Sequence, residues 1–175
     1  MNAWRGEIRA VYSTESAGAG MSELASGQLV AGVGLAGDRY ALGQGLYSHR
    51  WHPDRQLTLI AQEVIDALTL ALGEPVEGIE LRRNVVTHGV PLNSLVETRF
   101  AAGETILYGG RLNVPCRYLE RLTGKKVYKP LLGRSGLNCR ILRGGTIRAG
   151  DVVRPLSPAE AAEFPIEEVP ADEAG

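Results

Sequence analysis

Two stretches in the second half of the chain set its fold class: Glu104–Val114, ETILYGGRLNV, and Leu137–Val153, LNCRILRGGTIRAGDVV. In both, apolar residues alternate with polar ones, and a Gly-Gly pair interrupts the alternation. Because glycine reaches the positive φ values of a two-residue turn, the pattern predicts two β-hairpins. Their turns are expected at Gly109-Gly110 and Gly144-Gly145.

Shorter strands are expected before these hairpins. Ile8, Ala10 and Tyr12 alternate with more polar neighbours and predict a half-buried first strand. Arg55–Ile60 alternates in the same way. Arg82–Val86 also has the pattern of a strand, in which Arg82 and Asn84 would share one face and Arg83 would take the other.

Two helices interrupt the strands. Over residues 61–72 apolar side chains recur at helical spacing, and Gly73 then supplies a C-terminal stop. A shorter helix is expected over residues 115–123, with Pro115 at its first position and Gly124 after its end. Many short strands with few helices predict a mainly β fold of the α+β class, built as a β-barrel or a folded sheet.

Length and composition bound the possible classes of protein. The 175 residues, 44% hydrophobic and 22% charged, suit one globular domain and exclude both two large domains and wholesale disorder. No segment approaches the roughly 20 apolar residues that cross a bilayer, so we expect a cytoplasmic protein. The domain is expected over residues 1–154, and residues 155–175 as an acidic, flexible tail.

The net charge of −1 hides a strong asymmetry along the chain. Arg82–Arg154 holds 14 Lys and Arg against four acids, whereas the residues after Arg154 hold six acids and no base. The basic half could attract a phosphate, an anionic cofactor or nucleic acid. A solvated positive face without a specific partner fits the same charge pattern equally well.

Cys116 is the leading candidate for a reactive residue. It follows Pro115 at the expected start of a helix, where free backbone N–H groups and the helix dipole favour an anion, with Arg117 and Arg121 nearby. Its thiol should therefore ionise more readily than a free cysteine. Cys139 lies in a strand pattern and is expected to be structural. The two cysteines and three histidines lack metal-binding spacing, so no structural metal is expected.

Other segments allow a functional and a structural interpretation. Gly37-Asp38-Arg39 is a turn whose carboxylate could cap backbone N–H groups or meet a ligand. Leu42–Asp54 has no periodicity and could be a lid over a pocket or a plain surface loop. Arg82 and Asn84 could bind an anionic or heteroaromatic ligand. Alternatively, they could lie on an edge strand that faces solvent.

Five motifs, taken together, resemble the ordered signature of MOSC domains, which are named for the C-terminal domain of the molybdenum-cofactor sulfurases. The resemblance covers about residues 34–153 and keeps the order and spacing of the motifs. They are Gly34-Leu35-Ala36-Gly37-Asp38-Arg39-Tyr40, Arg55-Gln56-Leu57-Thr58-Leu59-Ile60, Arg82-Arg83-Asn84-Val85-Val86, Leu92-Asn93-Ser94-Leu95-Val96 and Pro115-Cys116-Arg117-Tyr118-Leu119-Glu120.

The resemblance implies a MOSC-like β-barrel and a pyranopterin molybdenum cofactor. In the family a cysteine that matches Cys116 carries sulfur or binds molybdenum, and residues that match Arg82 and Asn84 contact the cofactor. The other candidates for cofactor binding that it marks are Arg83, Asp38, Arg39 and Thr58. Many stand-alone relatives have Cys-Glu-Pro-Cys where this chain has Asn113-Val114-Pro115-Cys116, so a disulfide relay within the motif is excluded.

The relatives include reductases of N-hydroxylated bases and amidoximes. If this chain is such an enzyme, electrons should come from a partner protein, because the sequence shows no flavin, haem or iron–sulfur ligand pattern. We expect no pyridoxal-phosphate module, so the chain should not extract sulfur from cysteine by itself. Two alternatives stay open: a non-catalytic sulfur carrier or cofactor-handling protein, and a nucleic-acid-binding module, which the scarcity of aromatic residues in the basic half disfavours.

Overall fold

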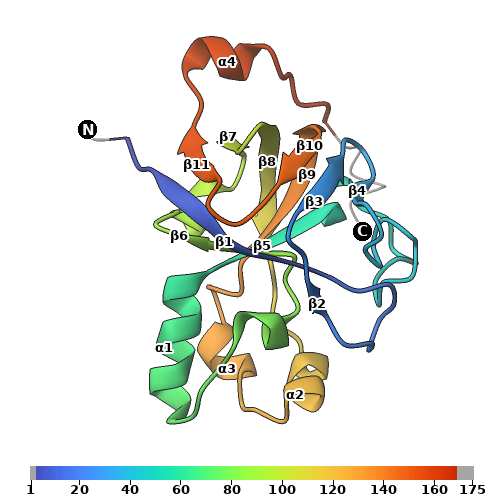
Figure 1. Cartoon of the computed structure of the whole chain (residues 1–175), viewed down its shortest axis with the longest axis vertical. Coiled ribbons are helices and arrows are strands. Elements are labelled where there is room, and N and C mark those ends of the chain that lie inside the picture. Colours follow the sequence, from blue (N-terminus) through green and yellow to red (C-terminus); the bar gives the residue numbers. More distant parts are fainter. Residues whose placement is uncertain (1–2, 169–175) are drawn as a thin grey trace.

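The structure is a computed structural model that describes residues 3–168. Seven strands close a β-barrel in the order β11-β7-β8-β9-β5-β6-β1, because β1 pairs with both β6 and β11 (Figure 1). The barrel strands are β1 (Gly6–Ser13), β5 (Leu57–Ala61), β6 (Val85–His88), β7 (Thr98–Ala102), β8 (Thr105–Leu112), β9 (Leu137–Arg143) and β11 (Val152–Pro155). All neighbouring pairs are antiparallel except β5 and β6.

Four short strands and several helical segments complete the described part of the chain. Strand β2 (Ser22–Glu23) pairs with the end of β1, while β3 (Gly27–Val30), β4 (Gly34–Leu35) and β10 (Gly145–Ile147) form a second small sheet. The α-helices are α1 (Gln62–Leu72), α2 (Arg117–Thr123), α3 (Tyr128–Leu131) and α4 (Pro158–Ala162), and the 3-10 turns are η1 (Pro53–Arg55), η2 (Gly78–Leu81) and η3 (Leu92–Leu95). The predicted mainly β class and the barrel are confirmed.

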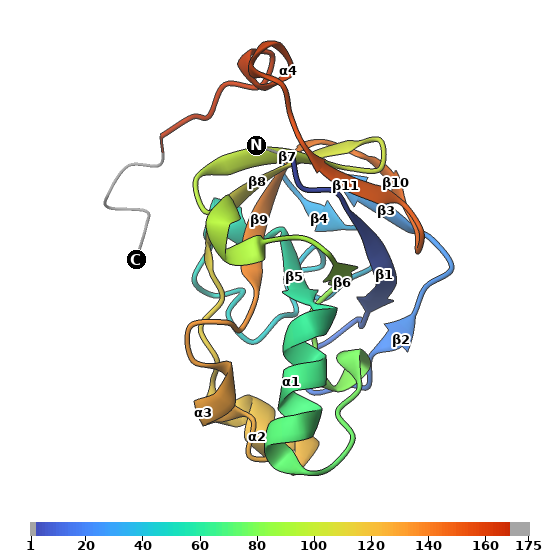
Figure 2. The ribbon, with the colours of Figure 1, turned by 90° about the vertical axis from the view of Figure 1, so that its left-hand side faces the viewer.

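Two apolar cores hold the fold together. Inside the barrel, fully buried side chains such as Phe100, Leu107 and Leu59 pack with one another. The second core lies between the barrel and helices α1, α2 and α3, which gather below the barrel in Figures 1 and 2, opposite α4. Ile65 and Leu68 supply the buried stripe of α1, and Gly73 ends that helix in the left-handed conformation, as the sequence predicts.

Gly109 and Gly110 do not form a turn, so the first predicted hairpin is wrong. Strand β8 continues through both residues, although its register with β9 shifts between Gly109 and Arg111, and the turn that joins β8 to β7 lies at Gly103, with φ +58°. Glycine is needed at both positions because other segments of the chain pass close to the β8 backbone there. A Cβ on Gly109 would lie 2.1 Å from the Leu95 carbonyl oxygen, and a Cβ on Gly110 would lie 2.0 Å from Asp54 Cγ.

The second predicted hairpin is also wrong, because β10 pairs with β3 and not with β9. The chain passes close to β3 at the Gly-Gly pair, where a Cβ on Gly144 would lie 2.4 Å from the Leu29 carbonyl oxygen. A later turn at Gly150, with φ +92°, leads into β11.

Strand β1 differs from its predicted alternation because its register with β6 shifts between Ile8 and Ala10. Beyond this shift, the residues of β1 that point into the barrel are no longer the ones that the simple alternation predicts. Ile8 and Val11 therefore point into the barrel core, whereas Ala10 and Tyr12 belong to the second core, between the barrel and the helices.

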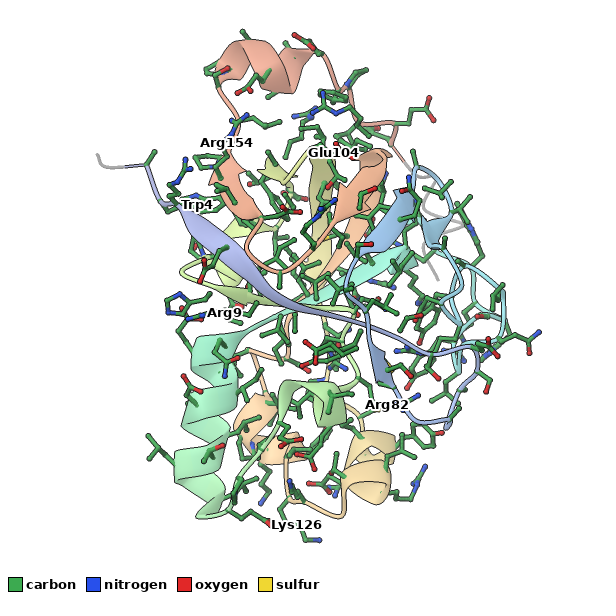
Figure 3. The ribbon with its side chains drawn as sticks, viewed as in Figure 1. Trp4, Arg9, Arg82, Glu104, Lys126 and Arg154 are labelled. Carbon is green, nitrogen blue, oxygen red and sulfur yellow. The ribbon has the colours of Figure 1, made fainter. Side chains whose placement is uncertain are left out.

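The acidic segment after Pro155, predicted to be flexible, begins with helix α4. Ser157 caps this helix in a capping box with Glu160, and Arg154 pairs with Glu160 at 2.8 Å beneath α4 (Figure 3). Residues 169–175 lie outside the described part of the chain, so the division into a domain and a flexible tail stays a prediction. No helix within residues 3–168 is long and apolar enough to cross a membrane.

Candidate functional site

A cavity of about 350 Å³ opens where β5, β8 and β9 meet the loop before α2 and the β4–β5 loop (residues 36–56). This volume lies in the range of small-molecule and cofactor sites. Five guanidinium groups line it, together with neutral polar side chains and one thiol. The charged and polar lining residues are Arg39, Arg55, Arg82, Arg83, Arg111, Tyr40, Tyr47, Thr58, Asn113, Asn138 and Cys116.

Part of the cavity wall is a row of side chains across three neighbouring strands. Thr58 of β5 lies opposite Asn138 of β9, and Asn138 lies opposite Arg111 of β8. Directly opposed residues project from the same face of a sheet, so the register of the barrel brings these three side chains together. Asn113, just after β8, donates a 2.7 Å hydrogen bond to Asn138 Oδ1 and continues the row.

Cys116 occupies the N-cap position of α2, with φ −130° and ψ 153°. It therefore stands one residue before the helix, whereas the sequence places it one residue inside, and Pro115 lies outside the helix. Helix α2 is seven residues long, and Arg83 and Arg82 line the same cavity as the thiol. The thiol is half-buried and lines the cavity, whereas Cys139 is sealed in the barrel core.

Arg83 is a buried guanidinium held by neutral acceptors. Its nitrogens donate to the carbonyl oxygens of Leu81 and Ser135, to Ser135 Oγ and to Asn113 Oδ1, at 2.7–3.0 Å. Burial lowers the pKa of Arg83 to about 10, so the group stays charged at neutral pH, and the nearby Cys116 sulfur opposes part of this shift.

Arg82 closes another side of the cavity, beside β2 (Figure 3). It ends η2 in the left-handed conformation, with φ 61°, and does not belong to β6. Its Nη1 donates to the Ala19 carbonyl oxygen at 2.6 Å, while Nη2 is buried and, within residues 3–168, has no hydrogen-bond partner. Burial, and then the positive charge of Arg39, lowers the pKa of Arg82.

Asn84 and Asp38 make structural hydrogen bonds to residues around the site. Asn84 is buried outside the cavity lining, and its Oδ1 accepts hydrogen bonds from the Thr58 backbone and hydroxyl at 3.2 and 3.1 Å. The expected sharing of one strand face by Arg82 and Asn84 is therefore wrong, and Arg83 joins Arg82 in the lining instead. Asp38 accepts from the Thr14 and Tyr40 amides and pairs with Arg39 at 3.2 Å.

Arg55 and Arg111 are lining residues that the sequence reasoning did not single out. Arg55 ends the buried η1 turn, and Arg111 precedes the end of β8. Burial, and then the charge of Arg111, lowers the pKa of Arg55, which shows that the two guanidiniums repel each other. For Arg55 a signal was available, because it stands in the Arg55–Ile60 motif that also carries the lining residue Thr58, whereas Arg111 stands in none of the five motifs.

The β4–β5 loop covers one side of the cavity through Tyr47. Trp51 in this loop is 63% exposed, but His52 and Asp54, at the end of the predicted excursion, are buried. Tyr47 and Cys116 line the same cavity, and burial, and then the Cys116 sulfur, raises the pKa of the Tyr47 hydroxyl. The loop is therefore part of the site: residues 42–51 are mostly exposed, as expected of a surface loop, whereas residues 52–54 are buried.

The lining has the chemistry of an anion site next to a soft nucleophile. Five guanidiniums face the cavity, and within residues 3–168 no Asp or Glu lines it; only Arg39 among the five has a carboxylate partner. Repulsion among these charges would be relieved by an anionic ligand. The described residues contain no cluster of three or more His, Cys, Asp or Glu that could hold a metal, and Cys116 carries the thiol in the cavity lining.

Comparisons with known proteins agree with this architecture. The family model for the MOSC domain matches residues 46–154, well over half of the chain. The YuaD protein of Bacillus subtilis is 20% identical with a TM-score of 0.72, over 88% of this chain and 100% of that chain. YiiM of Geobacillus stearothermophilus is 13% identical with a TM-score of 0.68, over 87% and 75% of the two chains.

YiiM of Escherichia coli is 19% identical with a TM-score of 0.60, over 96% of this chain and 75% of that chain. At these identities the solved structures establish a shared fold. None of the curated proteins matches the chain.

Proposed function

The chain belongs to the MOSC domain family, and we propose that it binds a pyranopterin molybdenum cofactor in the arginine-lined cavity. Cys116 would bind the molybdenum or carry sulfur for the cofactor. One observation carries the proposal: five guanidiniums, unopposed by any lining carboxylate within residues 3–168, surround a half-buried thiol.

The residues present fit the proposed group. A pyranopterin of this kind carries a phosphate, and the unpartnered Arg82 Nη2 is a buried donor that lacks an acceptor. Arg55 and Arg111 would hold the phosphate, since guanidinium forks match phosphate geometry. Asn113 and Asn138 offer amide donors and acceptors for the edge of a heteroaromatic ring.

The side chains around the sulfur would control its chemistry. Cys116 would provide a thiolate, a ligand type that suits soft metals, and the buried Arg83 guanidinium would stabilise its negative charge. When bound, the cofactor would supply two-electron oxygen-atom transfer. Tyr47, close to the sulfur, would shield it from water and hold a proton at its hydroxyl.

The reaction we propose is the reductive removal of oxygen from an N-hydroxylated substrate. Electrons would come from a partner protein. A smaller hollow lined by Ala17, Gly18 and Tyr118 adjoins the cavity, and Cys116 lines both. A substrate could enter there without displacing a ligand held by Arg55 and Arg111.

A sulfur carrier that does not turn over substrate is the second candidate. The position of Cys116 favours it, because the thiol is reachable from the cavity while Cys139 is fully buried. Such a protein would hold a persulfide on Cys116 without permanently bound metal. Nucleic-acid binding is not proposed, because these five arginines gather in one cavity and do not form a stripe along the surface.

Elemental analysis combined with intact mass tests both candidates in one preparation. Protein made in a cofactor-competent host should contain molybdenum, and Cys116→Ser should lose it, while Cys139→Ser serves as the control thiol variant. One added sulfur atom on Cys116 without metal would support the carrier. Full metal retention in Cys116→Ser would exclude the ligand role.

A further inference from the structure

A cluster of exposed apolar side chains lies on and beside the β4–β5 loop. Within residues 3–168 ten large apolar side chains are exposed, and six of them fall between residues 30 and 51: Val30, Val33, Leu42, Leu46, Tyr47 and Trp51. Single exposed apolar residues are ordinary, whereas such a concentration is typical of a surface that binds a partner. We call these six residues and Arg50 the Trp51 surface.

The Trp51 surface is contiguous at its centre and already formed. Several of its members share a hollow of about 120 Å³ with Arg55; they are Val33, Tyr47, Arg50 and Trp51. The Gly32 amide donates to Gln56 Oε1 at 3.1 Å, which ties the β3–β4 turn to the end of the loop. Arg55 donates to the Tyr47 carbonyl oxygen at 3.3 Å and lies 5.7 Å from the centre of the Tyr47 ring. Docking there would therefore require little ordering of the loop.

Two tyrosines connect this surface with the proposed site. Tyr40 and Tyr47 line the hollow of about 120 Å³, the arginine cavity and the smaller hollow that adjoins it. Cys116 lines the last two. A protein seated on the Trp51 surface would therefore have these rings between itself and the thiol, and it would leave the cavity free for a ligand. Figure 1 shows β3, β4 and the loop on the side of the barrel away from α1.

The charged side chains that line these hollows are all arginines. Within residues 3–168 no Asp or Glu lines any of the three, and the arginines are Arg39, Arg50, Arg55, Arg82, Arg83 and Arg111. The acids between residues 24 and 62 are Asp38 and Asp54, and both are buried. A protein that docks here therefore gains electrostatic attraction only if its own face is acidic.

The charges and the apolar composition favour a protein other than a second copy of this chain. In a two-fold dimer this face would meet itself, so Arg50 and Arg55 would face their own copies without acids between them. A nucleic acid requires a run of exposed cations along its phosphates, but only Arg50 is exposed among the six arginines. An apolar centre with a charged rim is instead typical of protein interfaces.

We propose that the Trp51 surface docks an electron-transfer protein whose redox group is surrounded by acidic residues, with Trp51 as the apolar anchor. The inference rests on the proposed function, since it names where the electrons of that reaction enter. In each turnover the reduced partner would give up two electrons, which together with two protons from solvent convert the N–OH group to N–H and release one water molecule. The positive field of the arginines would also speed association with an acidic partner.

Binding of an acidic flavodoxin, measured by isothermal titration calorimetry at low salt, tests the proposal. The test variant, Arg50→Gln/Trp51→Gln, changes residues that lie outside the lining of the arginine cavity. The matched control, Leu70→Gln/Arg148→Gln, also removes one exposed apolar side chain and one exposed arginine. Reduction of an N-hydroxylated substrate with dithionite, a small reductant that needs no docking, is measured on the same proteins.

The test variant should raise the Kd of flavodoxin at least about tenfold, because Trp and Arg are the side chains that contribute most to such interfaces. The control should bind like the wild type, and about 0.5 M NaCl should weaken wild-type binding. An unchanged Kd in the test variant, or no binding by the wild type, would overturn the docking inference, while turnover with dithionite would leave the proposed function standing. Docking without any turnover with dithionite would refute the proposed function, and with it the role of the partner as electron donor.

Two further outcomes would assign the surface to a different occupant. A wild-type dimer that sedimentation detects and the test variant loses would place a second copy on it. Salt-sensitive binding of a short single-stranded oligonucleotide that the test variant loses would place a nucleic acid there. Either result would overturn the proposal.

Discussion

Gly110→Ala should destabilise the protein far more than an ordinary substitution in a strand. The new Cβ would stand 2.0 Å from Asp54 Cγ and 2.3 Å from both carboxylate oxygens. Asp54 cannot move freely, because it is buried and bound to Arg140 at 2.5 Å. Overpacking costs about 1–3 kcal/mol, and a broken buried ion pair costs about 3–5 kcal/mol, so with partial relaxation we expect a loss of about 3 kcal/mol.

Thermal or denaturant unfolding monitored by circular dichroism measures this loss. At about 2–4 °C per kcal/mol for a chain of this size, the melting temperature should fall by about 6–12 °C. Gly20→Ala is the control, since no atom lies within 4 Å of its added Cβ. Asp54→Ala should reduce the cost of Gly110→Ala, which a double-mutant cycle detects. A cost below about 1 kcal/mol would refute the close approach of β8 and η1.

Three further predictions concern buried groups at or near the site. Burial, and then the charge of Arg111, lowers the pKa of His52 below 6.5. The neutral Nδ1 of His52 also accepts a hydrogen bond from the Asp54 amide. Protonation of His52 therefore favours the unfolded chain. Stability should fall as the pH drops from about 7.5 to about 5.5, and His52→Gln should flatten this slope in urea titrations; an identical slope would contradict the assignment. Burial, and then the charge of Asp54, raises the pKa of Cys139, so intact-mass mapping should find iodoacetamide on Cys116 only, and native labelling of Cys139 would show that the core opens. Arg83→Lys keeps the charge but loses the planar guanidinium that reaches Ser135 and Asn113. It should lower the free energy of unfolding by about 1–3 kcal/mol in denaturant titrations. An unchanged free energy of unfolding would mean that these hydrogen bonds are dispensable.

Local signals in the sequence were enough to predict the barrel class and helix α1. The apolar spacing of residues 61–72 and the stop at Gly73 depend on neighbours only a few residues away, and both are confirmed. The Gly-Gly pairs were misassigned because a glycine pair serves a turn and a close approach equally well. What decides between them at Gly110 is the carboxylate of Asp54, which is 56 residues away in the chain.

The candidate site likewise contains residues that local motifs reveal and residues that only long-range pairing brings into place. Cys116, Arg82 and Arg83 could be found because they stand in short motifs, and all three line the cavity. Arg111 could not be found, since its place depends on the register of β8 with β9 and β5. The face of Asn84 was assigned wrongly because the strand begins only at Val85, after a left-handed residue that the alternation did not reveal.

The molybdenum-to-protein ratio of Arg55→Gln/Arg111→Gln, with Cys116 intact, tests most directly whether the arginines and the thiol form one site. Charged hydrogen bonds to two guanidiniums would be lost, so cofactor affinity should fall about a hundredfold or more, and most of the metal with it. The control, Arg5→Gln/Arg148→Gln, removes two exposed charges elsewhere and should keep the wild-type ratio. Wild-type molybdenum content in a folded Arg55→Gln/Arg111→Gln protein would contradict the account.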